Sequence, residues 1–336
     1  SRPHAEEDHV MITPREVDSA EILVLVDNVT DGLSTTPRFV ENERAGQRRR
    51  GINVIAGDCY CCAAHGLACL VTLRAGGETR TLLFDSGPEA DVFARNVQRT
   101  GADLAGVGAV VLSHGHWDHG GGMLRALDLI QGANGGKPVP YYTHPGMFRQ
   151  RAAKNADGSF TPMENVPAPD ALAMHGTAPV VTTEPQLALD GLVWVSGEIP
   201  RVTPYERGLP GQHRRTDDGQ GWEPDELLMD ERCVAINVKG KGLVVFSACS
   251  HAGIVNVCTH ARASFPGVPL HGIVGGLHLS GPNERIIPET VEALRGFGLG
   301  MVAAGHCTGW RAIAALLTAF GDERLVPLAV GKRYRI

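Results

Sequence analysis

Three histidines and one aspartate occur within six residues of the stretch VLSHGHWDHG, as His114, His116, Asp118 and His119. The stretch follows an apolar segment and is itself followed by glycines. In an extended backbone, successive side chains point to opposite sides, so His114 and His116 point the same way. Imidazole is the commonest metal ligand near neutral pH, and one carboxylate adds negative charge. The pattern therefore indicates a metal site, and a polar surface loop rich in histidine is the alternative.

Other histidines stand in a similar context further along the chain. His251, His278 and His306 each follow a predicted strand and have small neighbours. Because ligands gather at the strand ends of α/β sheets, we expect these side chains to share one site with residues 114–119. Most of the remaining histidines are interpreted as surface residues or as residues behind the ligands: His65, His144, His175, His213, His260 and His271.

The elements that must position these residues follow from hydrophobic periodicity. Short apolar, β-branched runs that end at glycine or polar residues predict strands. These are 21–27, 67–74, 81–87, 108–114, 139–144, 192–197, 233–239, 242–248, 270–276, 299–305 and 324–330. Helical periodicity predicts helices over 88–101, 122–132, 253–265, 287–298 and 308–320. This alternation predicts an α/β fold in which two sheets pack together with helices outside, a four-layer αββα sandwich.

The domain organisation is expected to be simple. Residues 1–18 are polar at their start and are predicted to form a flexible segment, and residues 19–336 are predicted to form a single domain. The region 145–232 is weakly patterned and rich in Pro, Gly and Asp, which is typical of an inserted substrate loop or lid. Within it, Arg201 and Tyr205 are candidate substrate-binding residues, although a solvated loop face explains them as well.

Composition narrows the range of partners. The chain has 336 residues, 43% of them hydrophobic and 20% charged, with a net charge of −6 and no basic run beyond residues 48–50. Nucleic acid is therefore not expected as a partner, because binding phosphates needs a clustered basic surface. No apolar run reaches the roughly 18–20 residues that span a bilayer, so no membrane partner is expected. Eight cysteines in a chain this long do not suggest a disulfide scaffold, which favours a reducing, cytoplasmic location. A monomer or homodimer that acts on a small molecule fits these features.

The motifs together resemble a known family. The pattern His-x-His-x-Asp-His after a strand resembles the metallo-β-lactamase fold superfamily, and LLFDSG at 82–87 resembles its first motif, which implies that Asp85 supports the metal site. The resemblance extends over about 20–332 and narrows to the branch of 7,8-dihydropterin-6-methyl-4-(β-D-ribofuranosyl)aminobenzene 5′-phosphate synthase-like metal-dependent hydrolases. The motifs for this branch are VDNVTDG (26–32), AHGLACLV (64–71), GEIPRVTPYE (197–206), GLVVFSACSHAGIVN (242–256), GGLHL (275–279) and GHCTG (305–309).

The resemblance implies roles for particular residues. His114, His116 and His251 would hold a first metal ion, and Asp118, His119 and His306 would hold a second. His278 would reach the substrate or a metal, and Trp117 would line the pocket or pack beneath it. Many relatives have a bridging aspartate after the strand equivalent to 242–248, where this chain has no carboxylate. Cys249 would substitute for it, His251 would take a neighbouring position, or solvent alone would bridge.

The chemistry expected of such a site is hydrolysis. Zinc suits an imidazole-rich site with one carboxylate, although iron and manganese use similar ligands, and one or two ions are expected. A bound metal lowers the pKa of its water from about 15.7 toward about 7, so metal-bound hydroxide would attack the carbonyl carbon or phosphorus of an ester, lactone, lactam or phosphodiester. Asp118 and His278 are the candidate catalytic residues. The branch name suggests a pterin-related synthase as one alternative, and an iron-dependent redox enzyme on the same fold is another.

Overall fold

The larger of the two main sheets contains most strands of the N-terminal half of the chain, together with β10 (Thr177–Val181) and the C-terminal strand. The computed structural model describes residues 13–336. The strands lie side by side in the order β10, β7 (Val139–Thr143), β6 (Val107–Val111), β5 (Glu78–Phe84), β4 (Ala68–Ala75), β2 (Ser19–Val26), β19 (Arg333–Arg335) and β3 (Val40–Glu41). Strands β5, β6, β7 and β10 run parallel, whereas β2, β4 and β5 form an antiparallel meander.

The second main sheet contains strands of the C-terminal half. The order is β11 (Gln186–Ala188), β12 (Val193–Val195), β15 (Val234–Val238), β16 (Gly242–Ser247), β17 (Leu270–Gly276) and β18 (Met301–Gly305), with β1 (Glu16–Val17) also paired to β15. The last three strands, β16 to β18, run parallel to one another, so their carboxyl ends meet at one edge.

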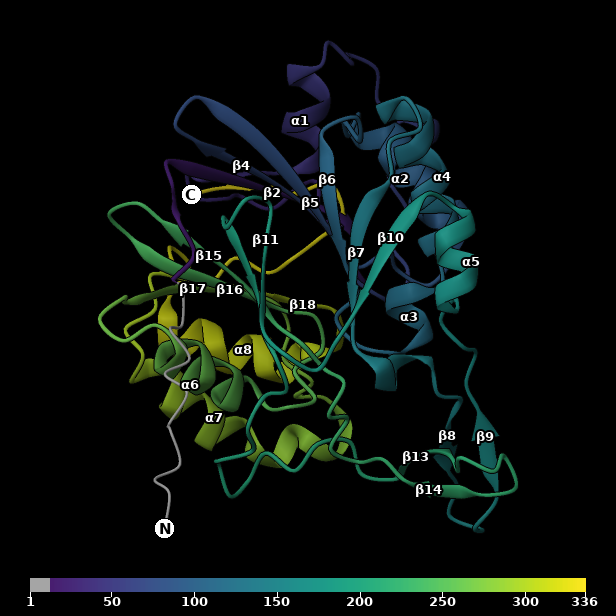
Figure 1. The fold of residues 1–336 in the computed structure, drawn as a ribbon. Helices are drawn as coiled ribbons and strands as arrows, with labels where there is room; N and C mark the ends of the chain where they lie inside the picture. Colours follow the sequence, from purple (N-terminus) through teal and green to yellow (C-terminus); the bar gives the residue numbers. More distant parts are fainter. Residues whose placement is uncertain (1–12) are drawn as a thin grey trace, which may run out of the picture.

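The two sheets pack face to face, with helices on both outer faces (Figure 1). The layer between the sheets is apolar and buried, and Phe84 of β5 meets Phe246 of β16 edge to face at 6.2 Å between ring centroids. The apolar faces of α2 (Ala90–Thr100), α4 (Met123–Asn134) and α5 (Pro169–Met174) cover the first sheet. Those of α6 (Ile254–Ser264), α7 (Ile287–Arg295) and α8 (Trp310–Phe320) cover the second. The predicted four-layer αββα sandwich is therefore confirmed.

The region 145–232 is more ordered than its composition suggests. It contributes β10 to the first sheet and β11 and β12 to the second. It also forms a third, four-stranded sheet that projects from the sandwich at the lower right of Figure 1. The expectation of one irregular insertion is wrong in this respect, because the third sheet is held by pairing between segments that lie far apart in sequence. Its order is β14 (Trp222–Pro224), β13 (Gln212–Arg215), β8 (Arg151–Lys154) and β9 (Phe160–Pro162).

The two ends of the chain also differ from the predicted elements. Residues 324–330 form only isolated bridges, although Val326 and Leu328 donate backbone hydrogen bonds to Val302 and Ala304, and the last strand is β19 instead. At the N-terminus, the predicted flexible segment 1–18 is described only from residue 13, and residues 1–12 lie outside the described part. Within that segment, β1 (Glu16–Val17) pairs with β15, so these two residues are part of the second sheet and not of a flexible segment. Among residues 13–336, no helix is both long and apolar enough to cross a membrane.

The remaining helices are short. One of them, α3 (Trp117–Gly120), lies inside the histidine cluster itself, so Asp118 and His119 stand on its single turn. The others are α1 (Glu43–Arg49) and the 3-10 turns η1 (Gly57–Cys59), η2 (Pro145–Phe148), η3 (Gly281–Ile286) and η4 (His306–Thr308).

Candidate metal centre

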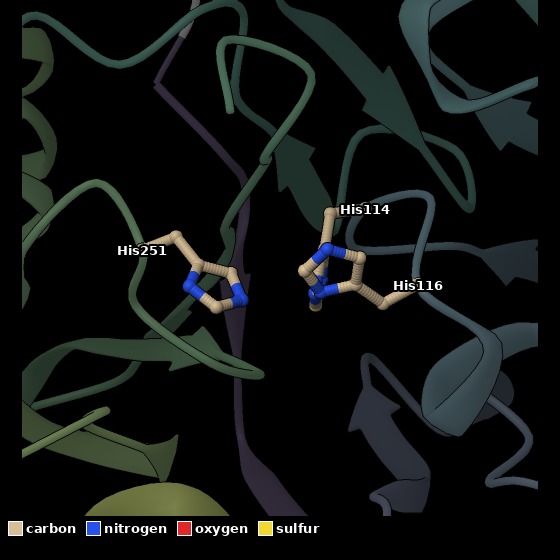
Figure 2. Close-up of side chains that lie close together, drawn as sticks. All are labelled: His114, His116 and His251. Atoms are coloured by element: carbon tan, nitrogen blue, oxygen red, sulfur yellow. The ribbon is translucent and has the colours of Figure 1, made fainter. Parts of the chain in front are cut away.

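The histidines predicted to meet do so between the two main sheets. The cluster 114–119 follows β6 of the first sheet, and His251, His278 and His306 follow β16, β17 and β18 of the second. Figure 2 shows His251 turned toward His114 and His116 across the space between them. Folding thus brings together side chains that are up to 192 residues apart, because both sheets end at this edge.

His114, His116 and His251 form the first donor group. Each offers a ring nitrogen within 4.8 Å of the others, and all three side chains are buried. His116 Nε2 and both ring nitrogens of His251 are buried and have no hydrogen-bond partner among the described residues. Buried polar atoms without partners are costly and rare, so this space is suited to a cation. The donor chemistry therefore fits a divalent metal ion.

Burial keeps these three imidazoles neutral. It lowers the pKa of His114 and of His251 well below the usual value, and neighbouring imidazoles add to the effect. Burial, followed by the Arg151 guanidinium, lowers the pKa of His116 to about 3. A neutral imidazole has a free lone pair, which is the form that ligates metal.

Asp118, His119 and His306 form the second donor group. Asp118 Oδ2 lies 3.6 Å from His119 Nε2 and 3.3 Å from His306 Nε2. The residues that the resemblance assigns to a second metal are therefore adjacent, and their role as ligands stays a prediction. His65, interpreted from the sequence as a surface or supporting residue, joins this group, because its Nε2 lies 3.4 Å from Asp118 Oδ2.

A thiol lies between the imidazoles of the second donor group. Cys249 Sγ is 3.4 Å from His119 Nε2 and 3.3 Å from His306 Nε2. Of the three alternatives left open by the sequence, this geometry favours Cys249 as the substitute. A second thiol, that of Cys307, lies 3.3 Å from Cys249 Sγ, and the sequence pattern did not mark it as part of the site. Its position directly after His306 was the only sequence feature that connected Cys307 with the site.

The protonation states of Asp118 and His119 in the second donor group are set by neighbouring charged side chains. Burial opposes ionisation of Asp118, but the imidazoles of His119 and His306 outweigh it and hold the pKa of this carboxyl far below its usual range. Burial likewise opposes protonation of His119, but the carboxylates of Asp118 and Asp85 raise its pKa to about 9. In the metal-free protein the proton therefore stays on His119 at neutral pH, and a cation bound there must displace it.

Asp85 holds His119 and Ser113 from behind the two donor groups, the place expected of a residue that supports a metal site. Its Oδ2 accepts hydrogen bonds from His119 Nδ1 at 2.7 Å and from Ser113 Oγ at 2.8 Å. Its Oδ1 accepts from the Ser113 backbone N–H at 2.7 Å. Because the Asp85 carboxylate accepts from Nδ1 of His119, Nε2 of this ring faces the site. A carboxylate behind a metal-binding histidine commonly fixes the ring in this orientation.

His306 is supported by residues from the end of β2. Asp27 Oδ1 accepts a hydrogen bond from the His306 backbone N–H at 2.8 Å, and Asn28 Oδ1 lies 2.9 Å from His306 Nδ1. Burial raises the pKa of Asp27 to about 6, although the contacts with His306 oppose the rise. The motif at 26–32 thus holds His306, which lies some 280 residues away in sequence.

Arg151 connects the third sheet to the histidine loop. This buried side chain donates from Nη1 to the Gly115 carbonyl at 3.0 Å and from Nη2 to Asp230 Oδ1 at 2.6 Å. Asp230 Oδ2 in turn accepts from the Gly115 N–H at 2.9 Å. Burial opposes ionisation of Asp230, but the Arg151 guanidinium and the Gly115 N–H hold its pKa below the usual value. The turn between His114 and His116 is therefore held on both sides.

Glu231 holds the backbone that carries His251. It is fully buried, and its two carboxylate oxygens accept from the backbone N–H groups of His251, at 2.8 Å, and Ala252, at 2.5 Å. Sequence reasoning missed both Asp230 and Glu231. The signal available was an acidic pair placed directly before the apolar strand predicted at 233–239.

We expect Glu231→Gln to weaken metal binding by about 10- to 100-fold, the usual cost of losing a residue that orients a ligand. The amide NH2 of glutamine cannot accept a hydrogen bond, so one of the two backbone N–H groups loses its partner. Competition against a coloured chelator measures the affinity. The exposed Glu289→Gln is the matched control and should bind metal like the unchanged protein; equal affinity in both variants would refute the role of Glu231.

A cavity of about 410 Å³ opens onto the two donor groups. His116, Asp118, His251 and His306 line it, together with both thiols, and so do the predicted substrate contacts Trp117 and His278. His278 Nδ1 is buried without a hydrogen-bond partner in the described part of the chain. A pocket of this size, largely apolar with a few convergent polar groups, is typical of small-molecule sites.

The structure does not bring Arg201 and Tyr205 into this cavity. The guanidinium of Arg201 donates to the backbone carbonyls of Ile199, Leu227 and Leu228. Neither side chain is among those that line the space, so we remove both from the candidate substrate contacts. Met163 and Leu209, from the region 145–232, line the cavity instead. They are apolar residues in a polar segment, and no sequence pattern marked them.

Comparisons with known proteins agree with this geometry. A family model described as the metallo-beta-lactamase superfamily matches residues 66–206. The chain is 27% identical over 263 residues to the 7,8-dihydropterin-6-methyl-4-(beta-D-ribofuranosyl)-aminobenzene-5′-phosphate synthase of Methanocaldococcus jannaschii, covering 77% of this chain and 86% of that enzyme. It is 26% identical to an uncharacterized protein of the same organism, MJ0448, over 76% of this chain and 88% of that one.

A solved structure shares the fold as well. Tm1679, described as a metal-dependent hydrolase of the beta-lactamase superfamily, superimposes with a TM-score of 0.67 at 21% identity, over 94% of this chain and 98% of that one. The αββα sandwich, the histidine-rich centre between its sheets and the match of residues 66–206 to the family model lead to one conclusion: the chain has the metallo-β-lactamase fold.

Proposed function

We propose that the protein is a metal-dependent hydrolase that acts on a small-molecule ester, lactone, lactam or phosphodiester. The observation that carries the proposal is the pair of adjacent donor groups, whose buried, unpartnered imidazole nitrogens border a cavity large enough for a small substrate. Zinc is the metal we propose first, with iron or manganese as alternatives, because imidazoles with one carboxylate and a thiol suit it best.

Some residues of the site would bind the metal ions, and others would act on the nucleophile or the substrate. His114, His116 and His251 would hold one ion, and Asp118, His119 and His306 a second. A divalent cation bound there would supply Lewis acidity and would lower the pKa of a coordinated water.

Asp118 would orient the nucleophile, because its carboxylate is ionised at neutral pH and accepts hydrogen bonds at Oδ2. His278 stands on the wall of the same cavity with Nδ1 unpartnered among the described residues. Burial opposes protonation of His278, but neighbouring groups, led by the Cys307 thiol, raise its pKa. We therefore propose that it holds a proton for the leaving group or binds the substrate. Proton transfer of this kind contributes roughly 100- to 10,000-fold to a rate.

The relative at 27% identity supports a second candidate function, a synthase reaction on a pterin-related substrate. The chain covers most of that enzyme. Fold and family are compatible with several chemistries, so the reaction has to be measured.

The test removes the metal and restores it. Protein freed of metal with a chelator is reloaded separately with zinc, iron or manganese, and each form is given ester, lactone, β-lactam and phosphodiester substrates. We expect hydrolysis of at least one class, only in a reloaded form, with one or two ions bound per chain by elemental analysis. Retention of metal without hydrolysis of any of these classes would count against the hydrolase and favour the synthase; retention of no metal would overturn both.

A further inference from the structure

Two thiols in the wall of the metal cavity are close enough to react with each other. Cys249 Sγ and Cys307 Sγ lie 3.3 Å apart, in the segments that follow β16 and β18. Their residues are 3% and 7% exposed, respectively, and both line the cavity, so a small molecule in that space reaches them without unfolding of the sheets. In the structure all eight cysteines are free thiols.

We propose that Cys249 and Cys307 form an oxidation site that a small hydroperoxide, such as hydrogen peroxide, converts to a disulfide. The sulfur of Cys307, the more exposed of the two, attacks one peroxide oxygen. The O–O bond breaks, Cys307 becomes a sulfenic acid, and the other oxygen leaves as water with the thiol proton. The sulfur of Cys249 then attacks the sulfenic sulfur, the S–S bond forms, and the hydroxyl leaves with the second thiol proton as a second water. Two thiols lose two electrons in all, and one peroxide is reduced.

The positions of the sulfurs suit this sequence of steps. A disulfide has an S–S distance of about 2.05 Å, so the two sulfurs must approach by a little over an ångström. Cys307 is followed by Thr308 and Gly309, and Gly309 has a φ of +81°, so the chain turns directly behind the thiol. Cys249 is followed by Ser250 at a φ of +57°. Each sulfur is thus carried on a turn rather than within a strand, and the parallel pairing of β17 with its neighbours need not change.

Oxidation would act on the metal centre itself. Cys249 Sγ is the atom that contacts the ring nitrogens of His119 and His306, and in a disulfide it would no longer be available to a cation as a thiolate. This consequence rests on the proposed function. We expect oxidation to lower metal affinity at the second donor group at least about 10-fold, as for other changes beside a ligand. A bound cation would in turn protect both thiols.

Intact mass and peptide mapping test the oxidation site without reference to catalysis. Metal-free full-length protein is treated with hydrogen peroxide, and the expected product has lost two hydrogens, contains a crosslinked peptide joining residues 249 and 307, and reverts with a thiol reductant. Cys249→Ser should stop the reaction at a sulfenic acid on residue 307, which a cyclic dione traps. The matched control Cys258→Ser, on the buried face of α6, should crosslink normally.

The outcomes separate this proposal from the proposed function. Failure to form the 249–307 crosslink in folded protein, or the same loss of two hydrogens in Cys307→Ala, would overturn the oxidation site whatever the enzyme hydrolyses. A reversible crosslink in a protein that hydrolyses none of the substrates would support the oxidation site and count against the hydrolase. Unchanged zinc affinity after crosslinking would overturn the link between oxidation and the metal centre.

Discussion

Asp118→Asn is expected to lower kcat/KM for the hydrolysed substrate by about 100-fold or more and to remove metal from the second donor group. The expected loss of activity exceeds the roughly 10- to 100-fold loss of metal affinity or activity that follows replacement of a residue that only orients a ligand, because Asp118 itself faces the proposed cation. Its Oδ2 lies within 3.6 Å of ring nitrogens of His65, His119 and His306, and it is the one carboxylate in the donor set. Asparagine keeps the shape but loses the charge and turns a donor NH2 or a weaker acceptor toward these rings.

Elemental analysis and steady-state kinetics on the same sample measure this effect. Asp128→Asn is the matched control, because Asp128 also contacts a histidine, with Oδ1 2.6 Å from His175 Nδ1, but on an exposed surface. The control should keep full metal content and rate. If Asp118→Asn kept two ions and the full rate, Asp118 would be neither ligand nor catalytic residue, and the second donor group would have to be reassigned.

Gly121→Ala should lower the free energy of unfolding by about 3 kcal/mol or more. The backbone at Gly121 is right-handed helical, with φ −63° and ψ −32°, so any residue could adopt it. The obstacle is the close approach of another segment: a Cβ there would lie 1.8 Å from the carbonyl oxygen of Pro88 and 2.8 Å from that of Trp117. Forcing atoms into a packed site costs about 1–3 kcal/mol, and the upper end or beyond applies when backbone has to move.

Urea unfolding followed by circular dichroism measures this loss. Gly132→Ala is the control, since Gly132 lies in α4 and a Cβ at this position would have no atom of the described residues within 4 Å beyond its own helix backbone and chain neighbours. Alanine is the better helix former, so this variant should gain roughly 0.5–1 kcal/mol. Equal unfolding midpoints for the two variants would show that the contact with Pro88 relaxes freely.

The close approach also corrects the reason for the glycines after the histidine cluster. The sequence suggests that residues 120–122 are glycine so that the chain can bend tightly. In the structure none of the three has a positive φ, and Gly121 and Gly122 instead pass within contact distance of backbone carbonyls of residues 86–89. Sequence alone does not separate these reasons, because both a positive φ and a close approach select glycine.

The layers of the fold could be predicted from the sequence, because buried strands and amphipathic helices have distinct hydrophobic periodicities. The strand predicted at 270–276 coincides with β17, and the helix predicted at 88–101 contains α2. The short strands β9, β13 and β14 could not be predicted, because runs of three or four residues are too short to show a usable alternation. Their pairing depends on contacts such as that of His213 with Ala152, which are distant in sequence.

For the candidate site, the residue types at the strand ends determined that a metal centre was expected, since few other purposes call for that many imidazoles in one pattern. Which atoms support them was decided only by the tertiary structure. Glu231 reaches the backbone of His251, Asp27 reaches that of His306, and Cys249 comes to lie between the rings of His119 and His306. These contacts depend on distances between side chains that the packing of two sheets brings together. The spacing of residues along the sequence does not predict those distances.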